Sequence, residues 1–212
     1  MKKMLVLLFV FAAFSASAHA ALIQFKLTAV STQGIGTIMV FNKTANTPGV
    51  VCNGTTPCTF TFKTGTNVAI TANSNSVGFA FNGWSPVRGS ATACASQTGA
   101  TCTFTITADS SATAKIDPVS NIKFQVGTGS GTIRVKRGGQ TLFDCTNTAP
   151  LACSTGVIEN TVLTIENIAG PNQQFGSYSN KVGSFQACTT NPCTVTVKGP
   201  TNSMVSNFIQ IP

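Results

Sequence analysis

Eight cysteines are the residues of this 212-residue chain with the most evident chemistry. None stands in a Cys-x-x-Cys motif, which argues against both a redox pair and a zinc ribbon. An even number of cysteines predicts a disulfide framework if the chain is exported. They form four close pairs, each bracketing a short loop between expected strands. Because these loops are short, closing them by local disulfides costs little chain entropy. The predicted disulfides are Cys52–Cys58, Cys94–Cys102, Cys145–Cys153 and Cys188–Cys193, with pairing across one half of the chain, as in Cys52–Cys102, the nearest alternative.

The chain has few residues that could carry out acid–base catalysis or bind a metal ion. The single histidine is His19, which lies in a segment that we expect to be removed. Without it the chain lacks the commonest general base and the commonest metal ligand, which excludes Ser-His-Asp and Cys-His catalysis and histidine-ligated zinc. The carboxylates are not clustered as a glycosidase pair or a calcium loop requires. We therefore expect no enzyme activity, no cofactor and no metal; the carboxylates in question are Asp109, Asp117, Asp144, Glu159 and Glu166.

The sharpest cluster of charge is the segment 134–137, with sequence Arg-Val-Lys-Arg. Strand alternation turns Val135 inward and the cations at 134 and 136 outward. If the strand at 122–126 pairs antiparallel with this one, Lys123 joins the same outer face. The alternative is a solvated edge kept charged against aggregation. The candidate polyanion contact comprises Lys123, Arg134, Lys136 and Arg137.

Residues 1–20 are typical of a secretory signal. Lys2 and Lys3 precede an apolar run, Met4–Phe14, that is too short to span a bilayer, and Ala18-His19-Ala20 offers a cleavage site. We predict a mature chain that begins at Ala21 and has no transmembrane segment. Removing the two lysines leaves 11 basic and 5 acidic residues, a net charge of +6. This thin spread of charge is unlike a nucleic-acid binder, so we expect a secreted or cell-surface location, with the periplasm as the alternative.

The elements that position these residues are expected to be strands. Threonine fills 32 positions, and short runs with period-2 alternation end at Gly, Pro, Asn and Ser clusters. The mature chain repeats one order of features, which predicts two tandem domains, 21–117 and 118–212. Pro118 is expected to interrupt strand pairing at their boundary. Glycine pairs at 34 and 36 and at 129 and 131 lack the rest of a phosphate loop and are interpreted as hairpin turns.

The single tryptophan, Trp84, could stack on a sugar, but a small β domain needs its largest side chain inside. We therefore assign Trp84 to the core, and Tyr178 likewise with its hydroxyl near the surface. The other inward candidates in the first half are Phe25, Leu27, Ile38, Val40, Phe60, Phe62, Val68, Ile70, Phe79, Phe81, Phe104 and Ile106.

The first half resembles the divergent internalin-type B-repeat, also called a bacterial repeat domain. The resemblance covers about 95 residues and rests on the cysteine pairs and on Gly34, Gly36, Thr37, Gly65, Thr66, Phe81, Gly83 and Trp84. The second half keeps Gly129, Gly131 and Thr132 but has Tyr178 where tryptophan is usual. The resemblance implies a small, disulfide-stapled, β-grasp-like fold in each half and a place in bacterial surface or secreted proteins.

Together these observations predict an exported, non-catalytic structural or adhesive module. Its partners would be an extracellular or cell-surface polymer or protein, including further copies of itself, and not nucleic acid. One alternative is a soluble binding protein for an anionic glycan or a host protein. Another is a filament subunit in which Ala21–Val30 is donated as a strand to a neighbour.

Overall fold

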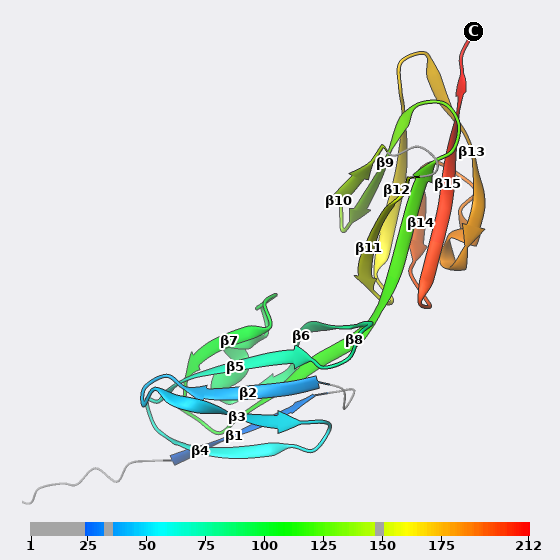
Figure 1. The fold of residues 1–212 in the computed structure, drawn as a ribbon. Coiled ribbons are helices and arrows are strands. Elements are labelled where there is room, and N and C mark those ends of the chain that lie inside the picture. The colour runs from blue at the N-terminus through cyan, green and yellow to red at the C-terminus, as the bar shows by residue number, and fades with distance from the viewer. Residues whose placement is uncertain (1–23, 32–35, 147–150) are drawn as a thin grey trace, which may run out of the picture.

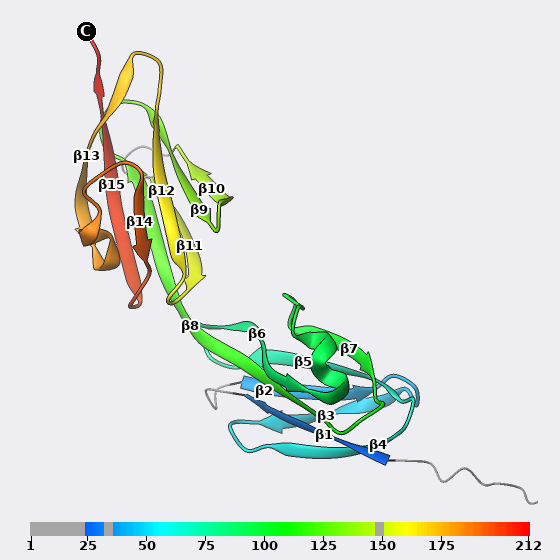
Figure 2. The ribbon, with the colours of Figure 1, turned by 180° about the vertical axis from the view of Figure 1, so that it is seen from behind.

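The computed structural model describes residues 24–31, 36–146 and 151–212, so the predicted signal at 1–20 lies outside the described residues and stays a prediction. The described chain is all-β, with three sheets arranged as two lobes (Figure 1). A single 17-residue strand, β8 (Ser110–Val126), runs from one lobe into the other (Figure 2). The largest sheet therefore extends through both lobes.

The first lobe contains two four-stranded layers. The strand order is β4-β1-β8-β6 in one layer and β3-β2-β5-β7 in the other. Its other elements are β1 (Gln24–Ser31), β2 (Gly36–Asn42), β3 (Thr47–Asn53), β4 (Cys58–Lys63), β5 (Asn67–Ser74), β6 (Phe79–Arg88), the 3-10 helix η1 (Gly89–Cys94) and β7 (Thr101–Thr105).

The second lobe has the same strand order. One layer runs β11-β8-β15-β13 and the other β10-β9-β12-β14. Its elements after β8 are β9 (Gly131–Arg137), β10 (Gln140–Cys145), β11 (Cys153–Ile158), β12 (Val162–Ala169), β13 (Gln173–Val182), the 3-10 helix η2 (Gly183–Ala187), β14 (Cys193–Thr196) and β15 (Thr201–Gln210). The division into domains 21–117 and 118–212 stays a prediction.

Each lobe is a sandwich of two sheets with a core between them, and not the β-grasp-like fold that the resemblance implied. The physical reason is the alternation itself. In β5, for example, Val68, Ile70 and Ala72 are buried while their neighbours are not. Such strands give every sheet one apolar face, and the only helices in the described residues, η1 and η2, are too short to cover it. The second sheet covers it instead.

Most of the described core assignments agree with this packing; Phe79, which is half-buried and outside the first core, is the exception. Trp84 is only 3% exposed and lies in the first core, where Phe81 packs against it at a ring distance of 5.3 Å. Phe60 and Phe62 are half-buried and pack against the same core. The side chains of Phe25 and Leu27 lie outside the described part. The predicted core residues that the structure buries are Ile38, Val40, Val68, Ile70, Trp84, Phe104 and Ile106.

Pro118 lies within a continuous strand, and β8 changes its pairing partners there. Residues before it pair with β1 in parallel and with β6, and residues after it pair with β11 and, in parallel, with β15. The carbonyl of Pro118 accepts a hydrogen bond from the Glu159 amide in the second lobe. The missing N–H of proline is thus placed where one set of partners gives way to the next.

The predicted hairpin turn at Gly129 and Gly131 is wrong, and Gly34 of the other pair lies outside the described residues. Strands β8 and β9 lie in different sheets, so the segment between them crosses the sandwich. A Cβ on Gly131 would lie 2.4–2.7 Å from three ring atoms of Phe208. A Cβ on Gly36 would lie 2.5 Å from Cδ1 of Ile116 in the first lobe. These glycines therefore permit close packing between the two sheets.

Candidate functional site

The four cysteine pairs lie as predicted, each at disulfide distance within its local loop. Their Cα–Cα distances are 5.8, 5.6, 5.8 and 5.5 Å in chain order. Two pairs, Cys52–Cys58 and Cys145–Cys153, join an edge strand of one sheet to an edge strand of the facing sheet. Each of these two disulfides therefore links the two sheets of its lobe along one edge.

The residues of the predicted polyanion contact are not assembled on one face. Strand β8, which carries Lys123, pairs with β11 and β15, and not with β9 as the prediction assumed. The inward position of Val135 is confirmed, since this side chain is fully buried. Strand β9 instead pairs with β10 and β12, which bring carboxylates to the outward cations.

Those carboxylates neutralise two of the four cations. Arg134 donates two hydrogen bonds to Asp144, from Nε to Oδ1 at 2.9 Å and from Nη2 to Oδ2 at 2.8 Å. This bidentate contact lowers the pKa of Asp144 and raises that of Arg134. Lys136 Nζ lies 2.6 Å from Glu166 Oε1. Among the described residues, Lys123 and Arg137 have no carboxylate within ion-pair distance.

Tyr178 is partly buried against the second core, as expected, and its ring lies 4.7 Å from that of Phe175. Its hydroxyl oxygen accepts a hydrogen bond from Asn167 Nδ2 at 2.7 Å. Burial raises the pKa of Tyr178 to about 12, so the phenol stays neutral at physiological pH. The residue anchors the edge of the second lobe, and a sugar-stacking role has no support from this geometry.

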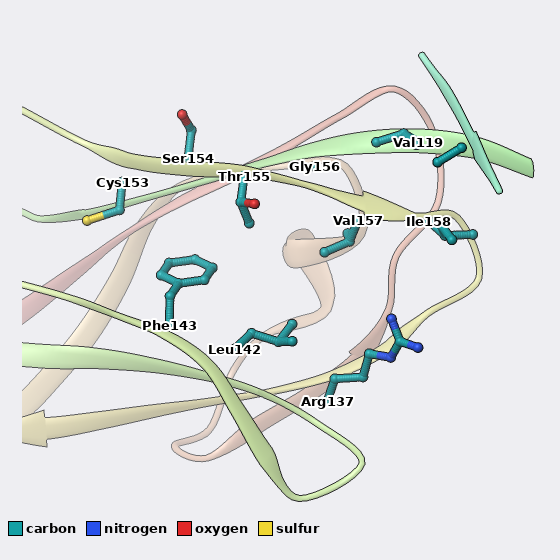
Figure 3. A pocket seen from close by; sticks show the side chains of 11 residues that line it. Val119, Arg137, Leu142, Phe143, Cys153, Ser154, Thr155, Gly156, Val157 and Ile158 are labelled. Carbon is teal, nitrogen blue, oxygen red and sulfur yellow. The ribbon is translucent and has the colours of Figure 1, made fainter. Parts of the chain in front are cut away.

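The feature that the sequence reasoning missed is an open groove of about 790 Å³, lined mainly by the second lobe and also by Ala80 of β6 in the first lobe. It lies between β10 and β11, the edge strands of the two facing sheets (Figure 3). Leu142 and Phe143 point into it from β10, and Thr155 and Val157 point into it from β11 (Figure 3). Arg137, the last residue of β9, lies at one end.

A β-bulge shapes the β10 wall. The register between β10 and β9 shifts between Thr141 and Phe143, so Leu142 is an extra residue with no direct partner. Such a bulge lets two consecutive side chains face the same side of a strand. Leu142 is consequently 42% exposed, while Phe143 lies beside Phe124 of the core at a ring distance of 5.9 Å.

The first lobe closes the corresponding space with its own side chains. Counting from the disulfide cysteine that begins β4 and β11, Phe60 corresponds to Thr155 and Phe62 to Val157. The two phenylalanine rings stack at 6.4 Å and pack against the first core. The groove therefore exists because the second lobe has smaller side chains at these two positions. Comparison of the two halves at these positions is the signal that could have found it.

The described residues offer no other site of recognised chemistry. None of their Cys, His, Asp and Glu side chains form a group of three or more that could hold a metal ion. Over the same residues, no helix is long and apolar enough to cross a membrane.

The fold and the groove thus define a two-lobed, disulfide-containing β-sandwich protein. No family model matches the chain, and no curated protein sequence matches it, so membership of the B-repeat family stays a prediction. In structure the chain is distantly similar to Gram-positive pilins and pilus adhesins. The minor pilin of Streptococcus agalactiae has 9% sequence identity and a TM-score of 0.37, over 89% of this chain and 97% of that one.

Two further solved structures are also distantly similar to this chain. The C-terminal fragment of a pilus adhesin from Lactobacillus rhamnosus GG has 8% identity and a TM-score of 0.35, over 90% of this chain and 98% of that one. The TIE protein of Bacillus anthracis has 8% identity and a TM-score of 0.32 over 88% of this chain. This chain spans only 34% of the TIE protein and 63% of a streptococcal ancillary pilin. These TM-scores are low, and the function is inferred from the geometry of this chain alone.

Proposed function

We propose that the protein is an extracellular structural module that carries tension between its two ends. The observation behind this proposal is the parallel pairing of β1 with β8 and of β8 with β15. Because β8 enters both lobes, these two ladders are connected in series along one strand. Exported location is supported by the four disulfides, which persist in oxidising compartments.

Parallel pairing decides how a pull acts on each ladder. Strand β1 begins at the end of the first lobe far from the junction, because it runs parallel to β8, which leads to the junction. Strand β15 ends at the far end of the second lobe for the same reason (Figure 1). A pull on the two ends slides each pair of strands along its axis, so all hydrogen bonds of a ladder resist together.

The disulfides leave these ladders free to carry the load. Each disulfide spans only five to eight residues, and none joins β1, β8 and β15 to one another. After a lobe ruptures, however, the disulfides limit how far its chain extends. In the first lobe they enclose loops of 6 and 8 residues, whose release adds roughly 35–40 Å of extended chain at about 3.4 Å per residue.

The test is single-molecule pulling on the mature chain, with handles at its two ends. We expect two rupture events, one for each lobe. When a reductant is present, the extension that follows rupture of the first lobe should be longer by roughly 35–40 Å. The matched control moves one handle to Asn172 and keeps the other at Pro212. Asn172 accepts a hydrogen bond from Ile211, and β13 pairs antiparallel with β15, so this pull opens the ladder one bond at a time.

The two pulling directions use the same folded protein, and thus stability is constant between them. We expect the end-to-end pull to rupture the second lobe at a force at least about twice that of the control pull, since unfolding under force follows the barrier along the pulled direction. Equal rupture forces in the two directions would overturn the proposal.

A further inference from the structure

We propose that the groove between β10 and β11 binds an extended segment of a partner protein, which adds to β11 as a further strand and carries an acidic group toward Arg137. This inference is independent of the tension-bearing role. It rests on unpaired strand edges, on the comparison between the two lobes and on the charge at the end of the groove.

Both strands that border the groove have a free edge in the described structure. Strand β11 pairs only with β8, and β10 pairs only with β9. The amide of Glu159 donates to Pro118, and hydrogen-bonded pairs alternate along an antiparallel ladder. The backbone groups of Ser154 and Gly156 therefore point away from β8, toward the open side, whereas the carbonyl of Ile158 already accepts a hydrogen bond from the Thr161 amide. An added strand would satisfy these donors and acceptors.

The first lobe indicates which side chains would fill the groove. There, Phe60 and Phe62 occupy the corresponding space, and these residues stand two apart on one strand. A partner strand presents alternate side chains to one face with the same spacing. Apolar side chains at positions i and i+2 of the partner would contact Leu142, Phe143 and Val157, as the two phenylalanines contact the first core.

Charge favours a polypeptide with an acidic group as the occupant. Arg137 is exposed and rises toward Ile158 at the end of the groove (Figure 3). Among the described residues it has no carboxylate within ion-pair distance, whereas Arg134 and Lys136 are both paired. A fatty acid would match the charge and the apolar wall, but it would leave the backbone groups at the edge of β11 without partners. The peptide satisfies all three features.

The test uses a phage library of random octapeptides selected against the mature protein, followed by binding of the enriched peptides as synthetic, fluorescein-labelled probes. We expect enriched peptides to carry apolar residues at i and i+2 and one acidic residue. Thr155→Phe places in the groove the residue that the first lobe has at 60, and it should weaken binding at least about tenfold. The matched control is Thr61→Phe, at an exposed position of β4, which should leave the dissociation constant unchanged.

Arg137→Gln should weaken binding about three- to tenfold and flatten its dependence on salt, because an exposed charge acts through a screened attraction. Its control, Arg88→Gln, removes an exposed arginine of the first lobe and should have no effect. Hydrogen exchange on the unaltered protein gives an independent measurement: peptide binding should slow exchange at 153–158.

Three results would overturn the proposal. The first is a library that yields no shared sequence. The second is a set of peptides that bind the Thr155→Phe variant as tightly as the unaltered protein, or that leave exchange at 153–158 unchanged. The third is saturable binding of oleate that Thr155→Phe abolishes, with no peptide bound, which would make the groove a lipid site.

Discussion

Replacing Gly131 with alanine should destabilise the second lobe strongly although it adds only one methyl group. The new Cβ would lie 2.4, 2.5 and 2.7 Å from three ring carbons of Phe208, whereas non-bonded carbons prefer about 3.5–4.0 Å. Phe208 is 2% exposed and packs edge-on against Phe175 at 6.3 Å, so its ring has little room to withdraw. A shift of about 1 Å in a packed core costs typically 1–3 kcal/mol, and we expect a loss of about 2–3 kcal/mol.

The first lobe provides a graded comparison for this prediction. The Cβ of a Gly36→Ala variant would lie 2.5 Å from Cδ1 of the buried Ile116 and 3.0 Å from the backbone carbonyl oxygen of Asn73. We expect it to cost about 1–2 kcal/mol, because one terminal methyl group moves more readily than an aromatic ring. Gly99→Ala is the neutral control, because its nearest neighbour is a carbonyl oxygen at 4.0 Å and it should change stability by less than about 0.5 kcal/mol.

The assay is urea unfolding with a separate probe for each lobe. The only tryptophan, Trp84, lies in the first core, and the only tyrosine, Tyr178, lies against the second, so tryptophan fluorescence and tyrosine absorbance follow the two lobes separately. Gly131→Ala should shift the tyrosine transition and leave the tryptophan transition in place.

A double-mutant cycle decides whether the steric explanation is correct. Phe208→Leu removes the ring, so the double variant Gly131→Ala/Phe208→Leu should be more stable than the sum of the single effects allows, by at least about 1 kcal/mol. Additive effects, or a Gly131→Ala variant as stable as the unaltered protein, would refute the close approach of the two sheets as the reason for this glycine.

Three further predictions concern charge and processing. Because burial raises the pKa of Tyr178 to about 12 while the unfolded chain loses this proton near pH 10, stability should fall as pH rises from about 10 to 12; an absorbance titration with a midpoint near 10 in the folded protein would contradict this. Replacing Asp144 by Asn and Glu166 by Gln frees the cations that they pair with, so retention on heparin resin should increase and should weaken with salt; an unchanged elution would show that the ion pairs do not mask the cations. The intact mass of the exported protein should correspond to a chain that begins at Ala21, and a mass that includes His19 would contradict the predicted cleavage.

The donated-strand hypothesis shows how far a local pattern can mislead. The alternation within Ala21–Val30 predicts a strand, and its described residues, 24–30, lie in β1, but a strand pattern does not specify a partner. In the structure, β1 lies between β4 and β8 of its own lobe: residues 24–29 pair with β4 and residues 27–31 pair with β8, so 27–29 are paired on both sides. The segment is a central strand of the first lobe, and its donation to a neighbour would require the lobe to open.

The sequence by itself determined the strand content, the buried face of strands such as β2, β5 and β7, and the local cysteine pairs. Strand alternation depends on residues two positions apart, and a local disulfide depends on a short loop. Both properties can therefore be recognised within a single segment of the sequence. Trp84 and Val135 lie inside for this reason.

Only the tertiary structure decided which strands become neighbours. The partners of β8 change at Pro118, Asp144 and Glu166 come to Arg134 and Lys136 from flanking strands, and the groove opens where two sheets separate. Alternation gives each strand an apolar face but leaves its neighbours unspecified, since any strand edge offers the same backbone donors and acceptors. The choice among them is made by packing between segments far apart in the chain, such as Gly131 against Phe208.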